Sequence, residues 1–252
     1  HSIYNPNELL TEGPWDYFML APLFGETSAT QTDSALMIGL AGGTTARQLI
    51  AAYPELRVDG VEIDPEVADV ARRFFGLTDP RIEVIIEDGR YFLRTTDRSY
   101  DIIGIDAYKQ PYIPFQLTTQ EFFREVDAHL TECGVAVVNV GRTSTDYRLV
   151  EAIASTMRSV FPAVFAVDVD RFTNTMVFGM SCPASVEAFG ANSAALAGDS
   201  IARTVAGWAL SSGNIRVIEP GGRVFTDDRA PVELVVDEMI VDAAREDSDD
   251  GE

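Results

Sequence analysis

Three acidic residues, Glu62, Asp88 and Asp106, each stand within two residues of the end of an apolar run. A carboxylate at the end of a buried strand loses hydration, so it needs a hydrogen-bond donor or a cationic partner. If the runs are parallel strands, their carboxyl ends meet at one edge of a sheet, where ligands bind. We therefore expect the three carboxylates to face one crevice and to do acid–base or ligand-binding chemistry there.

A cluster of glycines precedes the first of these acids. Gly39, Gly42 and Gly43 end the apolar segment 35–40, and Glu62 follows roughly 20 residues later, the spacing of a nucleoside site. In such sites the glycines let the backbone approach the ligand, and the carboxylate accepts hydrogen bonds from the ribose hydroxyls. Glu62 is thus the predicted ribose ligand, although glycine-rich turns also occur as plain packing.

The other two acids are assigned different tasks. Asp88, which Gly89 follows, is expected to accept a hydrogen bond from the exocyclic amine of an adenine, and Asp106 to face the reacting group. The alternative for each is that it caps the next helix. For Asp106 this alternative is weaker, because Thr118 and Thr119 are better placed as caps.

The histidine count excludes several kinds of catalysis. The chain holds two histidines, His1 and His129, and no Gly-x-Ser-x-Gly sequence. A Ser-His-Asp or Cys-His catalytic group would rest on His129 alone, and a histidine-rich metal centre is excluded. The chemistry must therefore use carboxylates, tyrosines, backbone groups or the reactivity of a cofactor, and no metal is predicted.

Composition restricts partners and location. The 252 residues carry a net charge of −21, which argues against binding duplex nucleic acid and suits either a cationic small molecule or simply an acidic surface. No apolar run is long enough to span a membrane, and no signal peptide is visible. Cys133 and Cys182 are too few for a disulfide scaffold, so we expect a reducing cytoplasm.

Strand-like and helix-like segments alternate along most of the chain. The pattern predicts an α/β fold with a doubly wound, mostly parallel seven-stranded sheet whose last strand is reversed. The expected strands are 35–40, 57–63, 81–86, 100–106, 134–140, 163–169 and 175–181, and the expected helices include 44–52, 65–75, 118–130, 145–160 and 200–210.

Three regions are predicted. Residues 1–33 are irregular and are interpreted as a truncated β-region, 34–182 form the nucleoside-binding α/β domain, and 183–252 form a C-terminal helical extension. The last residues, 246–252, are acidic and almost free of apolar side chains, so we expect them to be disordered.

Four linked motifs carry a family resemblance. The segments Gly39–Arg47, Val61–Pro65, Glu87–Leu93 and Tyr100–Asp106 resemble, in order and spacing, the spermidine synthase (polyamine aminopropyltransferase) family. The segment Thr226–Pro231 is similar to the C-terminal part of a bacterial spermidine synthase-like branch, some of whose members are fused to membrane domains.

The resemblance implies a fold, a co-substrate and a reaction. The fold is the Rossmann-like fold of class I methyltransferases, and the co-substrate is decarboxylated S-adenosylmethionine, whose aminopropyl group passes to a putrescine-like amine. Asp106 aligns with the catalytic aspartate of the family, which removes a proton from the attacking amine. The family commonly forms dimers or tetramers, so the resemblance admits a homodimer.

The chain departs from the family at several positions. Gly42 stands where the family has an aspartate that holds the amine of the aminopropyl chain, and Lys109 stands where a second aspartate follows the catalytic one. Tyr108 and Lys109 belong to an aromatic loop that could wall the acceptor pocket, and Tyr17 could replace a family tyrosine there. These departures leave two alternatives, which are a methyltransferase that uses S-adenosylmethionine and a non-catalytic nucleoside-binding member.

Overall fold

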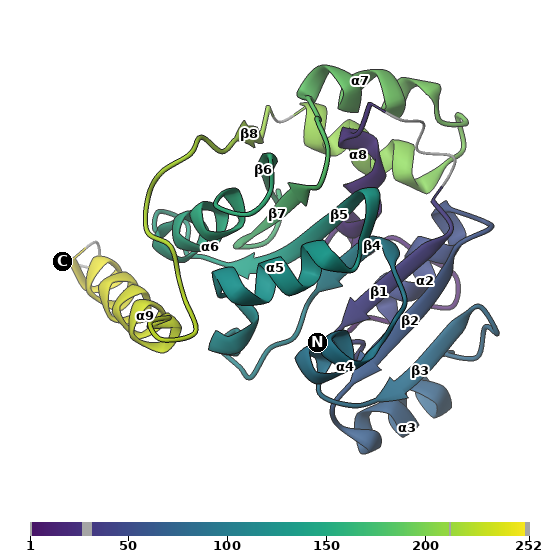
Figure 1. Cartoon of the computed structure of the whole chain (residues 1–252), viewed down its shortest axis with the longest axis horizontal. Helices are drawn as coiled ribbons and strands as arrows, with labels where there is room; N and C mark the ends of the chain where they lie inside the picture. Colours follow the sequence, from purple (N-terminus) through teal and green to yellow (C-terminus); the bar gives the residue numbers. More distant parts are fainter. Residues whose placement is uncertain (1, 27–31, 212, 250–252) are drawn as a thin grey trace.

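One mixed sheet organises the chain in the computed structural model, which describes residues 2–26, 32–211 and 213–249. Its eight strands lie in the order β3-β2-β1-β4-β5-β7-β6-β8 (Figure 1). They are β1 Ser34–Ile38, β2 Arg57–Glu62, β3 Ile82–Ile86, β4 Tyr100–Ile105, β5 Leu130–Gly141, β6 Ala163–Asp168, β7 Asn174–Met180 and β8 Ile215–Val217. Strands β1 to β5 pair in parallel, and β7 is antiparallel to both β5 and β6.

The predicted sheet is confirmed, with one addition. All seven expected strands form, and the reversed strand is β7, which lies between β5 and β6. The added strand is β8, three residues long, which pairs antiparallel with β6. Its sequence is too short to show a period of two, so pattern alone could not fix it.

Helices cover both faces of the sheet, because neighbouring strand residues point to opposite sides. Ala35 and Met37 of β1 face one core with α1 Pro14–Tyr17, η1 Phe18–Phe24, α2 Thr44–Ala52, α3 Pro65–Phe74, α7 Val186–Ala195 and α8 Ile201–Ser211. Leu36 and Ile38 face the other with α4 Gly89–Thr95, η3 Phe115–Leu117, α5 Gln120–Ala128, α6 Arg148–Arg158 and α9 Val232–Asp249.

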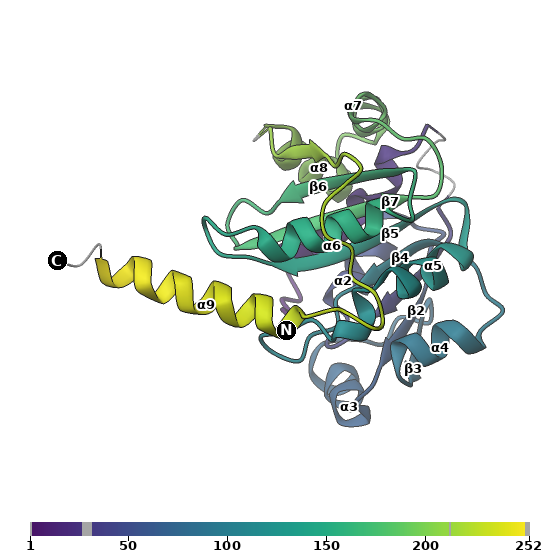
Figure 2. The same ribbon diagram turned by 60° about the vertical axis from the view of Figure 1, so that its left-hand side comes forward.

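The two ends of the chain differ from expectation. In place of a β-region, the described residues before 34 form α1 and η1, and Phe18 and Phe24 are fully buried between the sheet and α7. Aromatic burial outweighs the weak local signal there. At the other end, α9 continues to Asp249, into the segment expected to be disordered, while 250–252 lie outside the described residues. Figure 2 shows α9 projecting past the sheet.

The strand order places the ligand-binding edge. The chain leaves β1 on one side to form β2 and β3, then returns to form β4 on the other side of β1. This reversal opens a crevice outside the carboxyl ends of β1 and β4, where α/β proteins bind their ligands. Gly39 follows β1 and Asp106 follows β4, so the topology brings them to that crevice.

Arg90 connects the helix after Asp88 with the C-terminal region. Its side chain is nearly buried, donates two hydrogen bonds to Glu125 at 2.8 Å, and donates two more to Asp227 at 2.8 and 2.9 Å. Asp227 belongs to the 226–231 segment that resembles the bacterial branch. Bidentate arginine–carboxylate pairs fix orientation as well as position, so this contact sets where the chain enters α9.

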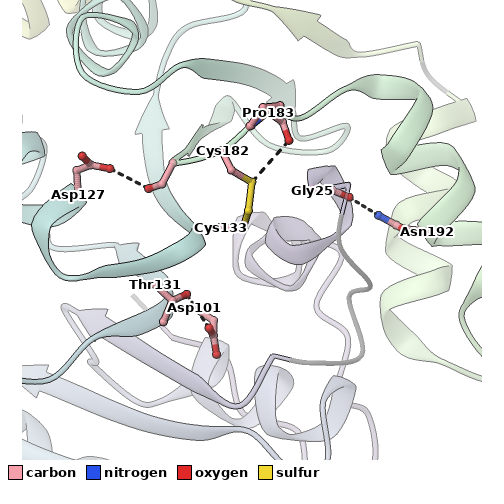
Figure 3. Close-up of a disulfide and its surroundings, with 9 residues drawn as sticks. Gly25, Asp101, Asp127, Thr131, Cys133, Cys182, Pro183 and Asn192 are labelled. Atoms are coloured by element: carbon pink, nitrogen blue, oxygen red, sulfur yellow. Dashed lines mark hydrogen bonds between the residues drawn. A yellow bond between two sulfur atoms is a disulfide. The ribbon is translucent and has the colours of Figure 1, made fainter.

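A disulfide joins Cys133, which lies within β5, to Cys182, which lies two residues after the end of β7 (Figure 3). The bridge closes the end of the β5–β7 pair, since Val135 lies opposite Met180 in the antiparallel register. The presence of only two cysteines did not predict a bridge. Because the two cysteines are bonded, the cysteine count no longer supports a reducing compartment. Among the described helices, none combines the length and apolarity that crossing a bilayer requires.

Candidate active site

The glycine turn is held against both β2 and the segment that follows β4. The amides of Gly39 and Leu40 donate to the Val61 carbonyl at 3.0 and 3.1 Å. Gly39 has φ +89°, and a Cβ there would lie 2.7 Å from backbone atoms of Ala107. Any larger residue would therefore force the turn away from Asp106.

Glu62 faces the same turn. Its Oε2 accepts from the Ala41 amide at 2.9 Å and its Oε1 from the Asp64 amide at 3.1 Å, while 8% of the residue is exposed. Each carboxylate oxygen has a second lone pair for a ligand hydroxyl. The adjacent Ile63 is 68% exposed, which offers an apolar surface beside the carboxylate.

Asp88 caps α4, the structural alternative considered for it. Its Oδ1 accepts from the Tyr91 amide at 2.9 Å. Gly89 is required by packing, because a Cβ there would lie 2.4 Å from Cγ2 of Ile38 at the end of β1. The helix cap uses Oδ1 of Asp88, so Oδ2 can still accept a hydrogen bond from a ligand.

Asp106 is half-buried at the carboxyl end of β4. Its amide donates to the Ile38 carbonyl at 2.9 Å, and its Oδ1 accepts from Nδ2 of Asn139 at 2.9 Å. Burial raises the pKa of Asp106 to about 6, and the hydrogen bond from Asn139 partly opposes that rise. The carboxyl group is therefore mostly ionised at neutral pH yet more basic than an ordinary aspartate.

Asn139 is a site residue that the sequence predictions missed. It lies on β5, is 5% exposed, and accepts from Nδ2 of Asn174 on β7 at 2.9 Å while donating to Asp106. Tyr108 completes the arrangement, since its hydroxyl donates to the Asn139 carbonyl at 2.8 Å and accepts from the Gly141 amide at 3.0 Å. A polar residue inside the apolar run 135–140 was the available signal.

Two cavities meet at Asp106. The larger, of about 410 Å³, extends from Asp106 and Asn139 toward α9. The smaller, of about 10 Å³, lies among Gly39, Thr44 and Thr45 of the glycine turn and the start of α2. Asp106 and Trp15 line both cavities. Asp106 thus stands between the glycine turn and a separate hollow, the position that a transfer between two bound molecules requires.

The side-chain hydroxyl of Thr45 has no partner within the described structure, and Thr45 is 5% exposed. It lines the smaller cavity, whose far wall is Ser2, and the Ser2 hydroxyl accepts from the Gly42 amide at 2.9 Å. A buried hydroxyl without a partner is costly unless water or a ligand reaches it.

The remaining predicted residues have different surroundings. A Cβ on Gly42 would lie 2.7 Å from both Phe75 and Ser2, so the position of the family aspartate is filled by neighbours. Lys109 is exposed and pairs through its backbone with Tyr112, and it lines neither cavity. Tyr17 is 2% exposed and packs in the core, whereas Trp15 contributes to the cavities.

The structure therefore brings together some of the predicted residues. Gly39 and Asp106 share a cavity, and Glu62 contacts the glycine turn through Ala41. Asp88 lies at the same sheet edge, where Gly89 packs on Ile38, but neither Glu62 nor Asp88 lines any of the main cavities of the described residues, so the expected single crevice shared by the three acids is not seen there.

A larger cavity, of about 830 Å³, lies elsewhere, between α6, β8 and α9. Its charged side chains pair with one another, as Arg148 does with Asp146 at 2.5 Å and with Asp242 at 2.7 Å. We do not assign the chemistry there, because it has no contact with the glycine turn or Asp106. Within the described part of the chain, no group of three His, Cys, Asp or Glu is arranged to hold a metal.

Comparison with known proteins identifies the family. A model of the spermine/spermidine synthase domain matches residues 19–189, which include the glycine turn and all three acids. The chain belongs to this family. It is 34% identical over 255 residues to a probable polyamine aminopropyl transferase of Bifidobacterium longum, an alignment that covers 93% of this chain and 56% of that protein. The chain thus spans about half the length of the curated relatives it matches.

Solved structures share the fold. A probable spermidine synthase from Corynebacterium glutamicum superposes with a TM-score of 0.64 at 21% identity, covering 84% of this chain and 80% of that one. Human methyltransferase-like protein 13 in complex with SAH gives 0.61 at 24% identity, covering 75% and 89%. The expected methyltransferase-type, Rossmann-like fold is confirmed.

Proposed function

We propose that this family member transfers an aminopropyl group from decarboxylated S-adenosylmethionine to an amine, with Asp106 as the base. The observation that carries the proposal is the position of Asp106 between the two cavities, with a pKa raised to about 6. Family membership supports the reaction class.

Proton transfer and displacement make up the reaction. An alkylamine has a pKa of about 10.4 and arrives as an ammonium ion. Burial makes Asp106 more basic, which narrows the gap between the two pKa values. Asp106 takes one proton, the freed nitrogen lone pair bonds to the carbon next to the sulfonium, and the carbon–sulfur electrons pass to sulfur. The products are a secondary ammonium and neutral methylthioadenosine.

Residues 34–182 supply the donor site in this proposal. Glu62 accepts hydrogen bonds from the ribose hydroxyls beside the amides that it already binds, and the exposed Ile63 lies against one face of the base. The free oxygen of Asp88 accepts from the adenine amine, and Gly89 lets α4 approach. The sulfonium end lies beside Gly39, whose turn packs against the backbone of Asp106 and Ala107, so that it reaches Asp106.

One observation favours a second function, methyl transfer from S-adenosylmethionine. The Gly42 amide bonds to a neutral hydroxyl of Ser2, and the position holds no carboxylate to retain the amine of an aminopropyl chain. A carboxylate-bearing methionine tail would not be repelled there.

Product analysis separates the two functions. The protein is incubated with either sulfonium donor and a panel of amines, and released nucleosides are separated by chromatography. We expect methylthioadenosine from the decarboxylated donor and no S-adenosylhomocysteine from the other. The opposite pattern would establish methyl transfer, and neither product with any amine would overturn the proposal.

A further inference from the structure

The cavity that would receive the amine is mainly apolar. Most of the exposed surface of the 410 Å³ hollow is apolar and comes from residues such as Trp15, Leu149, Phe172, Val236, Met239 and Ile240. Its polar lining residues besides Asp106 are Tyr108, Gln110, Asn139, Arg142, Thr143, Thr173 and Asn174. The rings of Trp15 on α1 and Phe172 in the turn between β6 and β7 meet edge to face, with their centroids 6.2 Å apart. The lining includes three residues of α9, so the last helix forms one wall.

Two residues of this lining are charged at neutral pH, and their signs are opposite. Asp106 is one, and the other is Arg142, whose side chain is 10% exposed. Arg142 donates from Nε to Thr175 Oγ1 at 3.2 Å and from Nη1 to the Thr143 carbonyl at 2.9 Å. These bonds hold the guanidinium in place.

The charge of Arg142 is poorly compensated. Its closest carboxylate is Asp168, at 3.8 Å. Asp168 already accepts two hydrogen bonds from Arg216, at 2.6 and 3.0 Å. One carboxylate is thus shared between two guanidinium groups, so Asp168 neutralises the charge of Arg142 only in part. A second ammonium in the cavity would be repelled by the guanidinium of Arg142.

Carboxylates near the cavity are engaged elsewhere. Asp237 of α9 accepts from the Tyr112 hydroxyl at 2.7 Å, Asp170 accepts from Asn214 at 2.9 Å, and Glu12 forms an ion pair with Arg171. In the described structure none of the three lines the hollow. The chain contains 40 acidic residues, so the shortage of carboxylates is local to this site.

Resting on the proposed function, we infer that the acceptor is an amine with a single cationic nitrogen on an apolar body, in contrast to a putrescine-like diamine. Its nitrogen meets Asp106, and its hydrocarbon part lies against α9, Trp15 and Phe172. A diamine would place its second ammonium near Arg142, where the lining offers neutral polar groups such as those of Gln110 and Asn174 but no second carboxylate, so it loses hydration without gaining an ion pair. A monoamine places a hydrocarbon end at that position, and each methylene that it buries there strengthens binding about fourfold.

Matched acceptors test the inference. Butylamine is compared with putrescine, and pentylamine with cadaverine. The two members of each pair have the same number of carbon atoms and differ by one ammonium group. With saturating decarboxylated S-adenosylmethionine, release of methylthioadenosine gives kcat/KM for each amine. We expect the monoamine to exceed its diamine partner by at least tenfold. Equal values, or a preference for the diamines, would overturn the inference.

A substitution on α9 tests the wall itself. Ile240 lines the cavity and is 50% exposed, so Ile240→Glu adds a carboxylate without burying it fully. We expect the monoamine preference to fall at least fivefold. The control is Leu234→Glu on the same helix, since Leu234 is 58% exposed and lies outside the lining. If both variants keep the preference of the unmodified protein, α9 is not the acceptor wall.

Binding separates failure of this inference from failure of the proposed function. If no amine yields methylthioadenosine, aminopropyl transfer is wrong, but the cavity can still be examined by thermal shift. Pentylamine should then raise the melting temperature more than cadaverine does at equal concentration, because ligands that bind the folded state stabilise it. A larger shift with cadaverine, or no shift with either amine, would overturn the inference on its own.

Discussion

The two halves of the candidate site are built differently. On the donor side, between β1, β2 and β3, backbone amides and carboxylates meet in short hydrogen bonds, as between Ala41 and Glu62. On the acceptor side, beyond β4, one carboxylate faces apolar side chains from α9 and a buried Arg142. Under the proposed function, the half assigned to the nucleoside keeps the family pattern of glycines and acids, while the half assigned to the acceptor departs from it.

Removing the charge of Asp106 gives the largest expected effect. Asp106→Asn keeps the size of the side chain but cannot take a proton from the amine, so kcat should fall by about 10² to 10⁴. Binding of methylthioadenosine by calorimetry should be almost unchanged, because the donor contacts remain. A kcat within a factor of three of the unmodified protein would show that Asp106 is not the base.

Glu62→Gln addresses the donor side and should have an intermediate effect. Hydrogen bonds to a charged group contribute about 1.5–3 kcal/mol, so the KM for the sulfonium donor should rise at least tenfold while the KM for the amine stays constant. Glu66→Gln is the matched control, since Glu66 is exposed on α3. A change in the amine KM alone would break the assignment of Glu62 to the donor half.

The smallest effect is a shift in pH dependence. The rate should rise with pH as Asp106 loses its proton near pH 6, and further as more amine is deprotonated. Asn139→Ala removes the hydrogen bond that lowers the pKa of Asp106, so the acid limb of kcat/KM should move to higher pH by about half a unit to one unit. Asn174→Ala leaves that bond intact and should move it less. A shift to lower pH in Asn139→Ala would contradict the argument.

The donor half was largely predictable from the sequence, because it depends on local signals. The signals lie close together in the chain: the glycines within 39–43, the strand-end carboxylate of Glu62 and the capping Asp64. This order is typical of the crevice that parallel sheets form beside β1. The helix caps at Asp64, Asp88 and Thr119 also follow from residue type alone.

The acceptor half was not predictable in the same way, because it depends on contacts between distant residues. Asn139 reaches Asp106 across 33 positions, and Ile240 joins the same cavity from the C-terminal helix. The cysteines that meet lie 49 residues apart. No local periodicity encodes these approaches. Tyr17, which was expected at the acceptor pocket, packs in the core, and Trp15 lines the cavity instead, because the sequence does not show which ring faces the cavity.

The contact of Arg90 with Asp227 fixes the segment that leads into α9, the helix that forms one wall of the proposed acceptor cavity. Val236 and Met239 of this helix pack in the second core, whereas Ile240 is half exposed and also lines the cavity, so a replacement at Ile240 changes the wall without disturbing Asp106 or its hydrogen bonds. If the proposed function holds, a change in amine specificity needs changes at the cavity-facing positions of one helix, while the glycine turn and the three acids stay as they are.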